Sequence, residues 1–453
     1  MESINPATGD LLASYAEHSS NEVTAALLRA SAEFDIWRRR PLDERASLMR
    51  ALADVLDARS DEWARLMTLE TGKPIAAARA EITKCALLCR YYADEAAAML
   101  ADRHISTERT KSYVHYEPLG VVLAVMPWNF PFWQVFRFAV PGLTAGNVGV
   151  LKHASNVSGC ALAIEEAFSE AGFPSAAFQT LLVPGSRVGE ILEHPAVAAA
   201  TLTGSELAGR EVAAKAGSLL KKTVLELGGS DPYLVLDDAD IDAAAATCAA
   251  SRMINAGQSC ISAKRFIVHE SVHDEWLAKF LAAMESVQMG DPLDEDTVLG
   301  PLARTDLRDE LHRQVLASIE AGATLALGGT VPDRPGAYYP PTVLTNVSPG
   351  MPAFEEELFG PVAAVSKATS EEEAIALAND TPFGLGAAVF TQDLERGERI
   401  AAEFLEAGTC VVNAFVASDP RLPFGGIKLS GYGRELSDLG IMEFVNQKTV
   451  VVA

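Results

Sequence analysis

The sequence has few cysteines and no long uninterrupted apolar run. Only six of its 453 residues are cysteine. They include no CxxC pair and no Cys/His cluster with zinc spacing, which argues against a disulfide framework and a zinc site. The most apolar region, residues 119–133, is interrupted by Pro127, Asn129 and Pro131 and is shorter than the roughly 20 residues of a spanning helix. We therefore expect free thiols in a reducing cytoplasm, no membrane segment and no metal.

Basic residues are also scarce. The chain has 37 Lys and Arg against 61 Asp and Glu, which gives a formal net charge of −24. Such a surface repels phosphate backbones and anionic lipids over any large contact area, so neither nucleic acid nor a membrane is an expected partner. The start of the chain has neither the basic stretch nor the apolar core of a secretory signal, and export is not expected.

The length predicts two or three domains, because 453 residues exceed what one hydrophobic core usually organises. Apolar residues three and four apart predict helices over residues 21–37, 42–70 and 76–101. From residue 120, short β-branched runs alternate with helical stretches, which is typical of a doubly wound parallel sheet. A similar series begins near residue 230 and predicts a second α/β domain.

Two β-rich segments, residues 110–116 and 445–453, fit neither series. Their partly alternating pattern predicts strands that pair with each other or with another subunit. No internal repeat or low-complexity tract is present, which excludes solenoid and array architectures.

Cys260 is the strongest candidate for a reactive side chain. It lies in NAGQSCIS, a turn rich in Gly, Gln and Ser between a predicted helix and the strand KRFIVH. Backbone amides in such a turn favour a thiolate and can hold an oxyanion formed beside it. Most free cysteines are small buried hydrophobes, and Cys85 and Cys89, one helical turn apart, fit that simpler interpretation.

Two other polar side chains lie in apolar surroundings. Glu226, in VLELGGS, is either a paired structural glutamate or a general base whose pKa is raised by burial. Asn129, in PWNFP, is either a buried amide bonded to backbone or a rigid donor to an oxyanion. The residues alone leave both alternatives open.

A further group suits a phosphate-bearing ligand. Lys152 ends the predicted strand NVGVLK, and α/β sheets bind ligands at the carboxyl ends of their strands, although surface cations are common. Gly204 and Gly209 open a helix after a strand, so amides near Ser205 can face a phosphate. The GxxxxG spacing differs from the GxGxxG of dinucleotide sites, and glycine often begins helices for packing alone.

Seven motifs together resemble the aldehyde dehydrogenase superfamily in order and spacing. They are PWNFP, LKHAS, GSELAG, LELGG, GQSC, EELFGP and PFGGIKLSGYGRE. The resemblance implies an α/β fold with two doubly wound open-sheet domains and a small β oligomerisation extension. It implies an NAD(P)-binding domain over residues 1–107 and 121–229, a catalytic domain over 230–430, an extension made of 108–120 and 431–453, and a homodimer or homotetramer.

The same resemblance implies an NAD(P)-dependent oxidation of aldehyde to carboxylate. Cys260 then attacks the carbonyl, while the Asn129 amide and the Cys260 backbone N–H hold the thiohemiacetal oxyanion. After hydride transfer to the nicotinamide, Glu226 activates the water that hydrolyses the thioester. Glu435, in GYGRE, matches a second carboxylate that relays protons.

The resemblance also supplies cofactor contacts, of which Glu357 and Phe359 match a clamp on the nicotinamide ribose. Ser155 stands where many NAD-preferring relatives have a glutamate that binds the ribose diol. A carboxylate there repels a 2′-phosphate and a serine does not, so NADP is the expected preferred cofactor, with NAD as the alternative. The full set is Trp128, Lys152, Ser155, Gly185, Gly204, Ser205, Gly209, Leu227, Glu357 and Phe359.

Within the superfamily the chain is most similar to succinate-semialdehyde dehydrogenases. Arg137 and Ser418 match their carboxylate-binding pair, and Trp133 lies in the same aromatic segment as Arg137. Ile254 occupies the position of a second arginine, and Ser262 that of a second cysteine that acts as a redox switch in some relatives. Arg137 can simply stack on aromatic side chains or pair with an acidic neighbour. Because a cation in such surroundings otherwise needs an anion, we expect a short aldehyde with a distal carboxylate, first of all succinate semialdehyde.

Two alternatives stay open at this point. A neutral aliphatic or a phosphorylated aldehyde is the other substrate class. A non-catalytic structural protein of the same fold is the rival from a different functional class, and it would have lost catalytic residues. Cys260, Glu226, Asn129 and Lys152 are all present.

Overall fold

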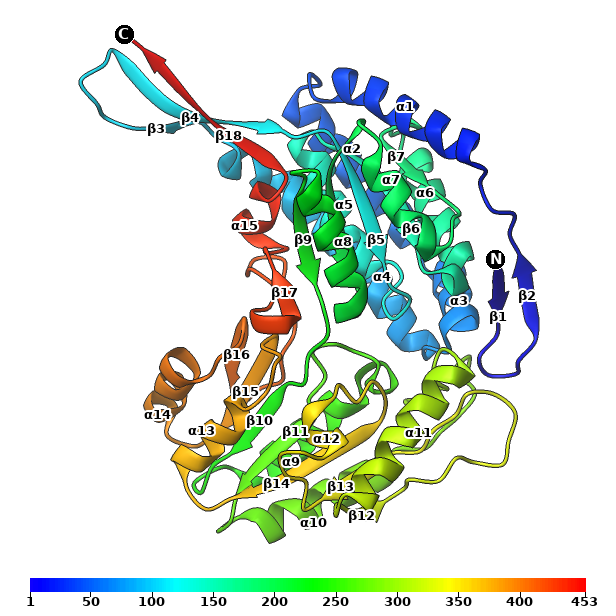
Figure 1. The fold of residues 1–453 in the computed structure, drawn as a ribbon, viewed down its shortest axis with the longest axis vertical. Coiled ribbons are helices and arrows are strands. Elements are labelled where there is room, and N and C mark those ends of the chain that lie inside the picture. Colours follow the sequence, from blue (N-terminus) through cyan, green and yellow to red (C-terminus); the bar gives the residue numbers. More distant parts are fainter.

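Two large sheets each organise one lobe of the molecule, and a β ribbon projects from one of the lobes (Figure 1). The computed structural model describes all residues from Met1 to Ala453. The chain opens with a short antiparallel hairpin of β1 (Glu2–Ile4) and β2 (Leu11–Ser14), which the sequence pattern did not predict. None of the helices is both long and apolar enough to cross a membrane.

Four helices follow the hairpin, and the predicted helix over residues 42–70 is wrong because it is two helices. The backbone turns at Arg59, whose φ of −101° and ψ of 10° end one helix and begin the next. The Arg59 guanidinium pairs there with Glu62, Glu166 and Glu170. The four helices are α1 (Ser20–Trp37), α2 (Leu42–Ala58), α3 (Ser60–Thr71) and α4 (Ile75–Met99).

The first lobe contains a six-stranded sheet of order β17-β9-β8-β5-β6-β7, parallel except for its pairing with β17. Its strands are β5 (Val121–Met126), β6 (Val148–His153), β7 (Phe178–Thr180), β8 (Val197–Thr203), β9 (Lys222–Glu226) and β17 (Gly431–Tyr432). Its helices are α5 (Trp133–Ala145), α6 (Ser158–Glu170), α7 (Val188–Glu193) and α8 (Glu206–Ser218). Short 3₁₀ turns lie at Ser155–Val157 and Gly185–Arg187.

The second lobe contains a seven-stranded sheet of order β12-β13-β14-β11-β10-β15-β16, parallel except for β12. Its strands are β10 (Pro232–Val235), β11 (Arg265–His269), β12 (Thr324–Leu327), β13 (Thr342–Thr345), β14 (Val362–Ala368), β15 (Gly386–Phe390) and β16 (Thr409–Val412). Its helices are α9 (Ile241–Met253), α10 (His273–Glu285), α11 (Thr305–Glu320), α12 (Pro352–Glu355), α13 (Glu371–Asn379) and α14 (Leu394–Arg399). The chain passes from the first sheet to the second between β9 and β10, near residue 230 as the pattern predicted.

The projecting ribbon joins the two β-rich segments that fitted neither series. β18 (Val445–Val452) pairs antiparallel with β4 (Lys111–Pro118) along its whole length, and β3 (Arg103–His104) flanks β4. Of the two pairings that the pattern allowed, the pairing of these segments with each other is therefore the one observed. The segment 431–453, expected to belong wholly to the extension, divides in two, because β17 joins the first sheet and α15 (Ser437–Met442) packs onto the core of the first lobe.

Candidate active site

Two cavities meet at Cys260. The first, of about 290 Å³, is lined by α4, α5, the turn around Cys260 and residues 415–424, and we call it the helix cavity. The second, of about 250 Å³, is lined by the carboxyl ends of β5, β8 and β9 together with Leu307, Glu357 and Phe359, and we call it the sheet cavity. Cys260 and Gln134 are the only residues that line both. A group attached to this sulfur is therefore accessible from either side.

The turn that presents Cys260 has an unusual backbone. Asn255, Ala256 and Gly257 all have left-handed φ values of 54°, 54° and 73°. At Gly257 a Cβ would lie 2.1 Å from the Gly360 carbonyl oxygen, so only glycine fits there. Asn255 stabilises the turn by donating from Nδ2 to the carbonyls of Asn129 at 2.8 Å and Gln258 at 3.1 Å. Sequence reasoning did not identify Asn255.

A buried lysine also holds this turn, and sequence reasoning missed it as well. Lys264 donates from Nζ to the carbonyls of Ser259 at 3.0 Å, Cys260 at 2.8 Å and Ser262 at 3.3 Å. The same Nζ lies 3.4 Å from a carboxylate oxygen of Glu357. One cation therefore fixes the backbone on both sides of the nucleophile.

The surroundings of Cys260 favour its protonated thiol in the free protein. Burial raises its pKa to about 12, although the cations of Arg137 and Lys264 act in the opposite direction. Cys85, Cys89, Cys160 and Cys248 are fully buried, as expected of structural cysteines. Attack by Cys260 on a carbonyl therefore requires a base.

Asn129 lies three residues after the end of β5 and is 4% exposed. Its Nδ2 donates to the Gln258 carbonyl at 3.1 Å, which holds the amide against the Cys260 turn. An amide nitrogen carries two hydrogens, so the second one is free to donate to an oxygen in the sheet cavity, which Asn129 lines together with Cys260.

Two buried carboxylates lie near Arg137, although neither of them lines either cavity. Glu226, at the end of β9, is 2% exposed, and neither of its oxygens has a hydrogen-bond partner. Burial, followed by the nearby charge of Glu435, raises the pKa of Glu226 well above its usual range. Burial also raises the pKa of Glu435. A carboxylate with a raised pKa is suited to accept a proton near neutral pH.

Arg137 has an anion within the protein, as in the simpler of its two interpretations. Its Nε lies 2.6 Å from Oε2 of Glu435, and its guanidinium lies 4.6 Å from the centre of the Phe424 ring and donates to Gln134. The partner was not visible in the sequence because it comes from a distant segment. Arg137 still lines the helix cavity, as do the other two predicted substrate contacts, Trp133 and Ser418.

A second buried ion pair positions α5. Lys73 and Glu81 form this pair, with side chains only 1% and 2% exposed. Glu81 also accepts from the backbone N–H groups of Phe132 at 2.9 Å and Trp133 at 3.0 Å, at the start of α5. A carboxylate at a helix N-terminus satisfies otherwise unpaired amides. Neither residue was identified from the sequence.

The structure separates the predicted cofactor residues into two groups. The first group lines the sheet cavity with Cys260: Trp128, Gly204, Ser205, Leu227, Glu357 and Phe359. In the second group, Lys152 is the last but one residue of β6 and Ser155 begins the turn that follows, while Gly185 adjoins Lys152. Gly209 packs against Leu227, where a Cβ would lie 2.6 Å from the leucine side chain. Its role is to let α8 approach Leu227.

These residues fit a dinucleotide. Lys152 is nearly buried and forms neither an ion pair nor a hydrogen bond, and burial lowers its pKa. A Cβ on Gly185 would lie 3.9 Å from the Lys152 Nζ, so the missing side chain leaves room beside the cation. Ser205 begins α8, whose N-terminal amides attract anions. An unpaired cation and a helix N-terminus on one sheet edge suit a phosphate-bearing ligand.

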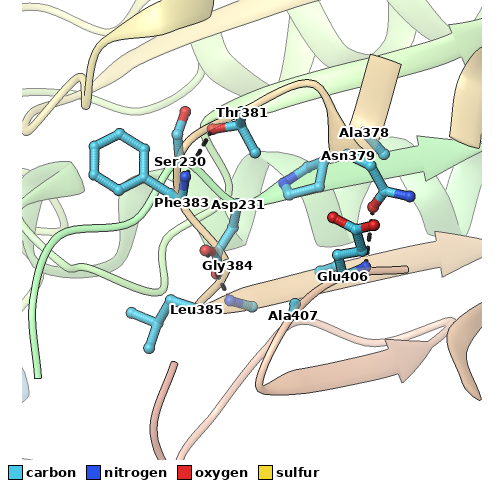
Figure 2. A pocket seen from close by; sticks show the side chains of 13 residues that line it. Ser230, Asp231, Ala378, Asn379, Thr381, Phe383, Gly384, Leu385, Glu406 and Ala407 are labelled. Atoms are coloured by element: carbon cyan, nitrogen blue, oxygen red, sulfur yellow. Dashed lines mark hydrogen bonds between the residues drawn. The ribbon is translucent and has the colours of Figure 1, made fainter. Parts of the chain in front are cut away.

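A separate small cavity in the second lobe surrounds Asp231 (Figure 2). Burial raises the pKa of Asp231 to about 6, and its carboxylate accepts from the Gly386 N–H at 3.0 Å. Figure 2 shows Asp231 beside the loop that carries Thr381 and Leu385. The cavity measures about 10 Å³, which is water-sized and too small for an organic substrate.

No group of three or more His, Cys, Asp or Glu side chains is placed to bind a metal ion.

Comparison with known proteins decides the family. The model of the aldehyde dehydrogenase family matches residues 1–450. The chain belongs to this family. This aldehyde dehydrogenase is 53% identical over 450 residues to a Synechocystis sp. protein named "Probable succinate-semialdehyde dehydrogenase", with NADP(+) in its name, and 99% of each chain is covered. It is 51% identical over 453 residues to succinate-semialdehyde dehydrogenase (NADP+) of Mycobacterium leprae, again with 99% of each chain covered.

Solved structures agree with this assignment. Succinic semialdehyde dehydrogenase from Streptococcus pyogenes, in complex with NADP+, matches this chain with a TM-score of 0.97 at 37% identity. The match covers 100% of this chain and 99% of that chain. The predicted family, fold class and enzyme class are therefore confirmed.

Proposed function

We propose that this aldehyde dehydrogenase oxidises succinate semialdehyde to succinate and prefers NADP to NAD. The observation that carries the proposal is the placement of Cys260 between two cavities of different chemistry. The sheet cavity adjoins the edge that carries Lys152 and the N-terminus of α8, while the helix cavity contains lysine and arginine side chains that attract a carboxylate. The names of the relatives support the same substrate and cofactor.

The first chemical step is attack by the Cys260 sulfur on the aldehyde carbon. The thiol proton passes to the Glu226 carboxylate, whose raised pKa suits it as an acceptor. The carbonyl oxygen becomes an oxyanion, which accepts hydrogen bonds from the Asn129 amide and the Cys260 backbone N–H. NADP, when bound in the sheet cavity, supplies the acceptor for the hydride that leaves the same carbon.

Hydrolysis of the resulting thioester needs a water molecule and a base. Once the thiol proton has left Glu226, its carboxylate removes a proton from that water as the water oxygen attacks the acyl carbon. The carbon–sulfur bond then breaks to release the acid and the Cys260 thiolate. Glu435 is held by Arg137 beside Glu226 and passes the proton onward. The charge of Glu435 raises the proton affinity of Glu226 by like-charge repulsion.

The preference for NADP rests on Ser155 and Lys152. Ser155 lies two residues after the end of β6, so its hydroxyl and the unpaired Lys152 ammonium lie on the same edge of the sheet. A 2′-phosphate accepts a hydrogen bond from the hydroxyl and pairs with the cation. The carboxylate found at this position in NAD-preferring relatives would repel that phosphate.

The projecting ribbon is the proposed contact between subunits of a homodimer or homotetramer. β18 is an edge strand whose outer backbone groups are unpaired, and its Val451 and Val452 are 54% and 46% exposed. Exposed edges of this kind pair readily with another chain. The proposed compartment is the cytoplasm, because six free thiols suit reducing conditions.

A substrate panel tests the proposed function. We would measure kcat/KM for succinate semialdehyde, butanal and a phosphorylated short aldehyde with each cofactor. Succinate semialdehyde with NADP should give the highest value. A higher value for butanal would refute the substrate assignment, and a higher value with NAD would refute the cofactor preference.

A further inference from the structure

Three cations line the helix cavity, and two of them have carboxylate partners. Lys73 pairs with Glu81, and Arg137 pairs with Glu435. Lys84 forms no ion pair. Its one hydrogen bond runs from Nζ to the neutral hydroxyl of Ser418 at 2.8 Å.

The surroundings of Lys84 compensate its charge only in part. Its Nζ lies 4.3 Å from the centre of the Trp133 ring, which gives a cation–π contact. Burial, followed by repulsion from Arg137, lowers its pKa to about 8. The hydroxyl and the aromatic ring together stabilise the buried ammonium less than the water that it loses on burial. The site therefore favours an additional anion.

Lys84 can supply the positive charge that a second arginine supplies in succinate-semialdehyde dehydrogenases, because its side chain reaches the same cavity. Ile254 occupies the position of the second arginine of succinate-semialdehyde dehydrogenases, and it lines the helix cavity with an apolar side chain. Lys84 lines the same cavity from α4, so its charge reaches this space from a different element.

We infer that Lys84 is the carboxylate-binding residue that determines substrate specificity, with Ser418 as its partner in the helix cavity. The inference rests on the proposed function, in which the substrate carries a distal carboxylate. The ammonium donates to one carboxylate oxygen, and the Ser418 hydroxyl, no longer needed as an acceptor, donates to the same group. Arg137 contributes charge from the same cavity while remaining paired with Glu435.

Substitution of Lys84 by methionine tests this inference, because methionine keeps the length of the stem and removes the charge. For succinate semialdehyde, kcat/KM should fall about 10- to 100-fold, mostly through KM, as expected for loss of a charge-assisted hydrogen bond. For butanal it should stay within threefold, which also shows that the variant is folded. Lys84→Arg should recover most of the loss. Arg79→Met is the matched control, since it removes an exposed cation from the same helix away from the cavity.

The outcomes separate this inference from the proposed function. If the unmodified enzyme prefers butanal, the proposed function fails and the inference fails with it. If it prefers succinate semialdehyde but Lys84→Met changes both substrates equally or neither, only the assignment of Lys84 is overturned.

A measurement on the unmodified enzyme does not depend on the folding of any variant. The charged and titratable groups around Lys84 are Arg137, Glu81, Cys85 and Asp419. Hydrogen bonds hold the pKa of Asp419 at about 2, and burial raises that of Cys85 well above its usual range, so neither of them titrates near pH 8. Lys84 loses its charge as pH rises through about 8.

The ratio of kcat/KM for succinate semialdehyde to that for butanal should therefore fall above this pH. Taking the ratio cancels the titration of Cys260 and Glu226, which both substrates share. A ratio that is constant from pH 6.5 to 9.5 would overturn the inference.

Discussion

Replacing Glu81 by glutamine removes one charge from a buried ion pair and leaves the other without a partner. The Lys73 and Glu81 side chains are 1% and 2% exposed, so water cannot replace the lost carboxylate. Glutamine keeps a carbonyl oxygen that can still accept from the amides of Phe132 and Trp133. The substitution therefore isolates the charge of Glu81 from its hydrogen bonds to α5.

Breaking a buried ion pair by removing one partner costs about 3–5 kcal/mol, because the remaining ion stays desolvated. Part of this cost can be relieved if Lys73 loses its proton, since burial already lowers its pKa. The double variant Lys73→Met with Glu81→Gln contains no unpaired ion. We therefore expect the double variant to be more stable than Glu81→Gln alone.

Urea unfolding followed by tryptophan fluorescence measures the difference. A chain of two lobes need not unfold in one step. We therefore compare the urea concentration at the midpoint of the first transition in the unmodified protein, both single variants and the double variant. The reasoning is refuted if Glu81→Gln unfolds at the urea concentration of the unmodified protein. It is also refuted if the losses in the two single variants simply add in the double variant, because independent sites behave in that way.

Four further predictions concern the catalytic residues and the cofactor. Cys260→Ala should abolish turnover, and peptide mapping after aldehyde trapping should find the acyl group on Cys260 and on no other cysteine. Glu226→Gln should slow both the initial burst of NADPH, because Glu226 accepts the Cys260 proton, and steady-state turnover by roughly 10² to 10⁴, the range for a lost general base; an unchanged steady-state rate contradicts this role. Ser155→Glu should shift the ratio of kcat/KM towards NAD, and an unaltered ratio places the 2′-phosphate site elsewhere. Lys264→Met should raise the pKa of Cys260 further and slow its alkylation by iodoacetamide at pH 9, whereas faster alkylation contradicts the electrostatic role of Lys264.

Features that depend on neighbouring residues could be predicted from the sequence. The alternation of strands and helices, the change of domain near residue 230 and the turn that carries Cys260 all arise from residues close together in the chain. The β-rich character of residues 110–116 and 445–453 was visible for the same reason. Their partnership needed the structure, because a strand pattern does not name its partner.

Features that depend on distant residues could not be predicted. Lys84 and Ser418 are 334 positions apart, and nothing in either segment points to the other. Arg59 separates α2 from α3 within a continuous helical pattern, and its side chain reaches Glu166, 107 positions away. For Arg137 the need for an anion was predicted correctly, but the source of the anion was not, because Glu435 supplies it from within the protein.

The arrangement of two cavities that share only Cys260 and Gln134 separates the two specificities of the enzyme. Ser155 and Lys84 lie on different elements and are proposed to contact different ligands. Changes at sites without shared partners usually have additive free energies. A lineage of such enzymes can therefore exchange one cofactor for the other without altering its aldehyde, or accept a new aldehyde without altering its cofactor. In protein engineering, the two cavities can likewise be optimised in separate libraries of variants, and the best substitutions from each can then be combined.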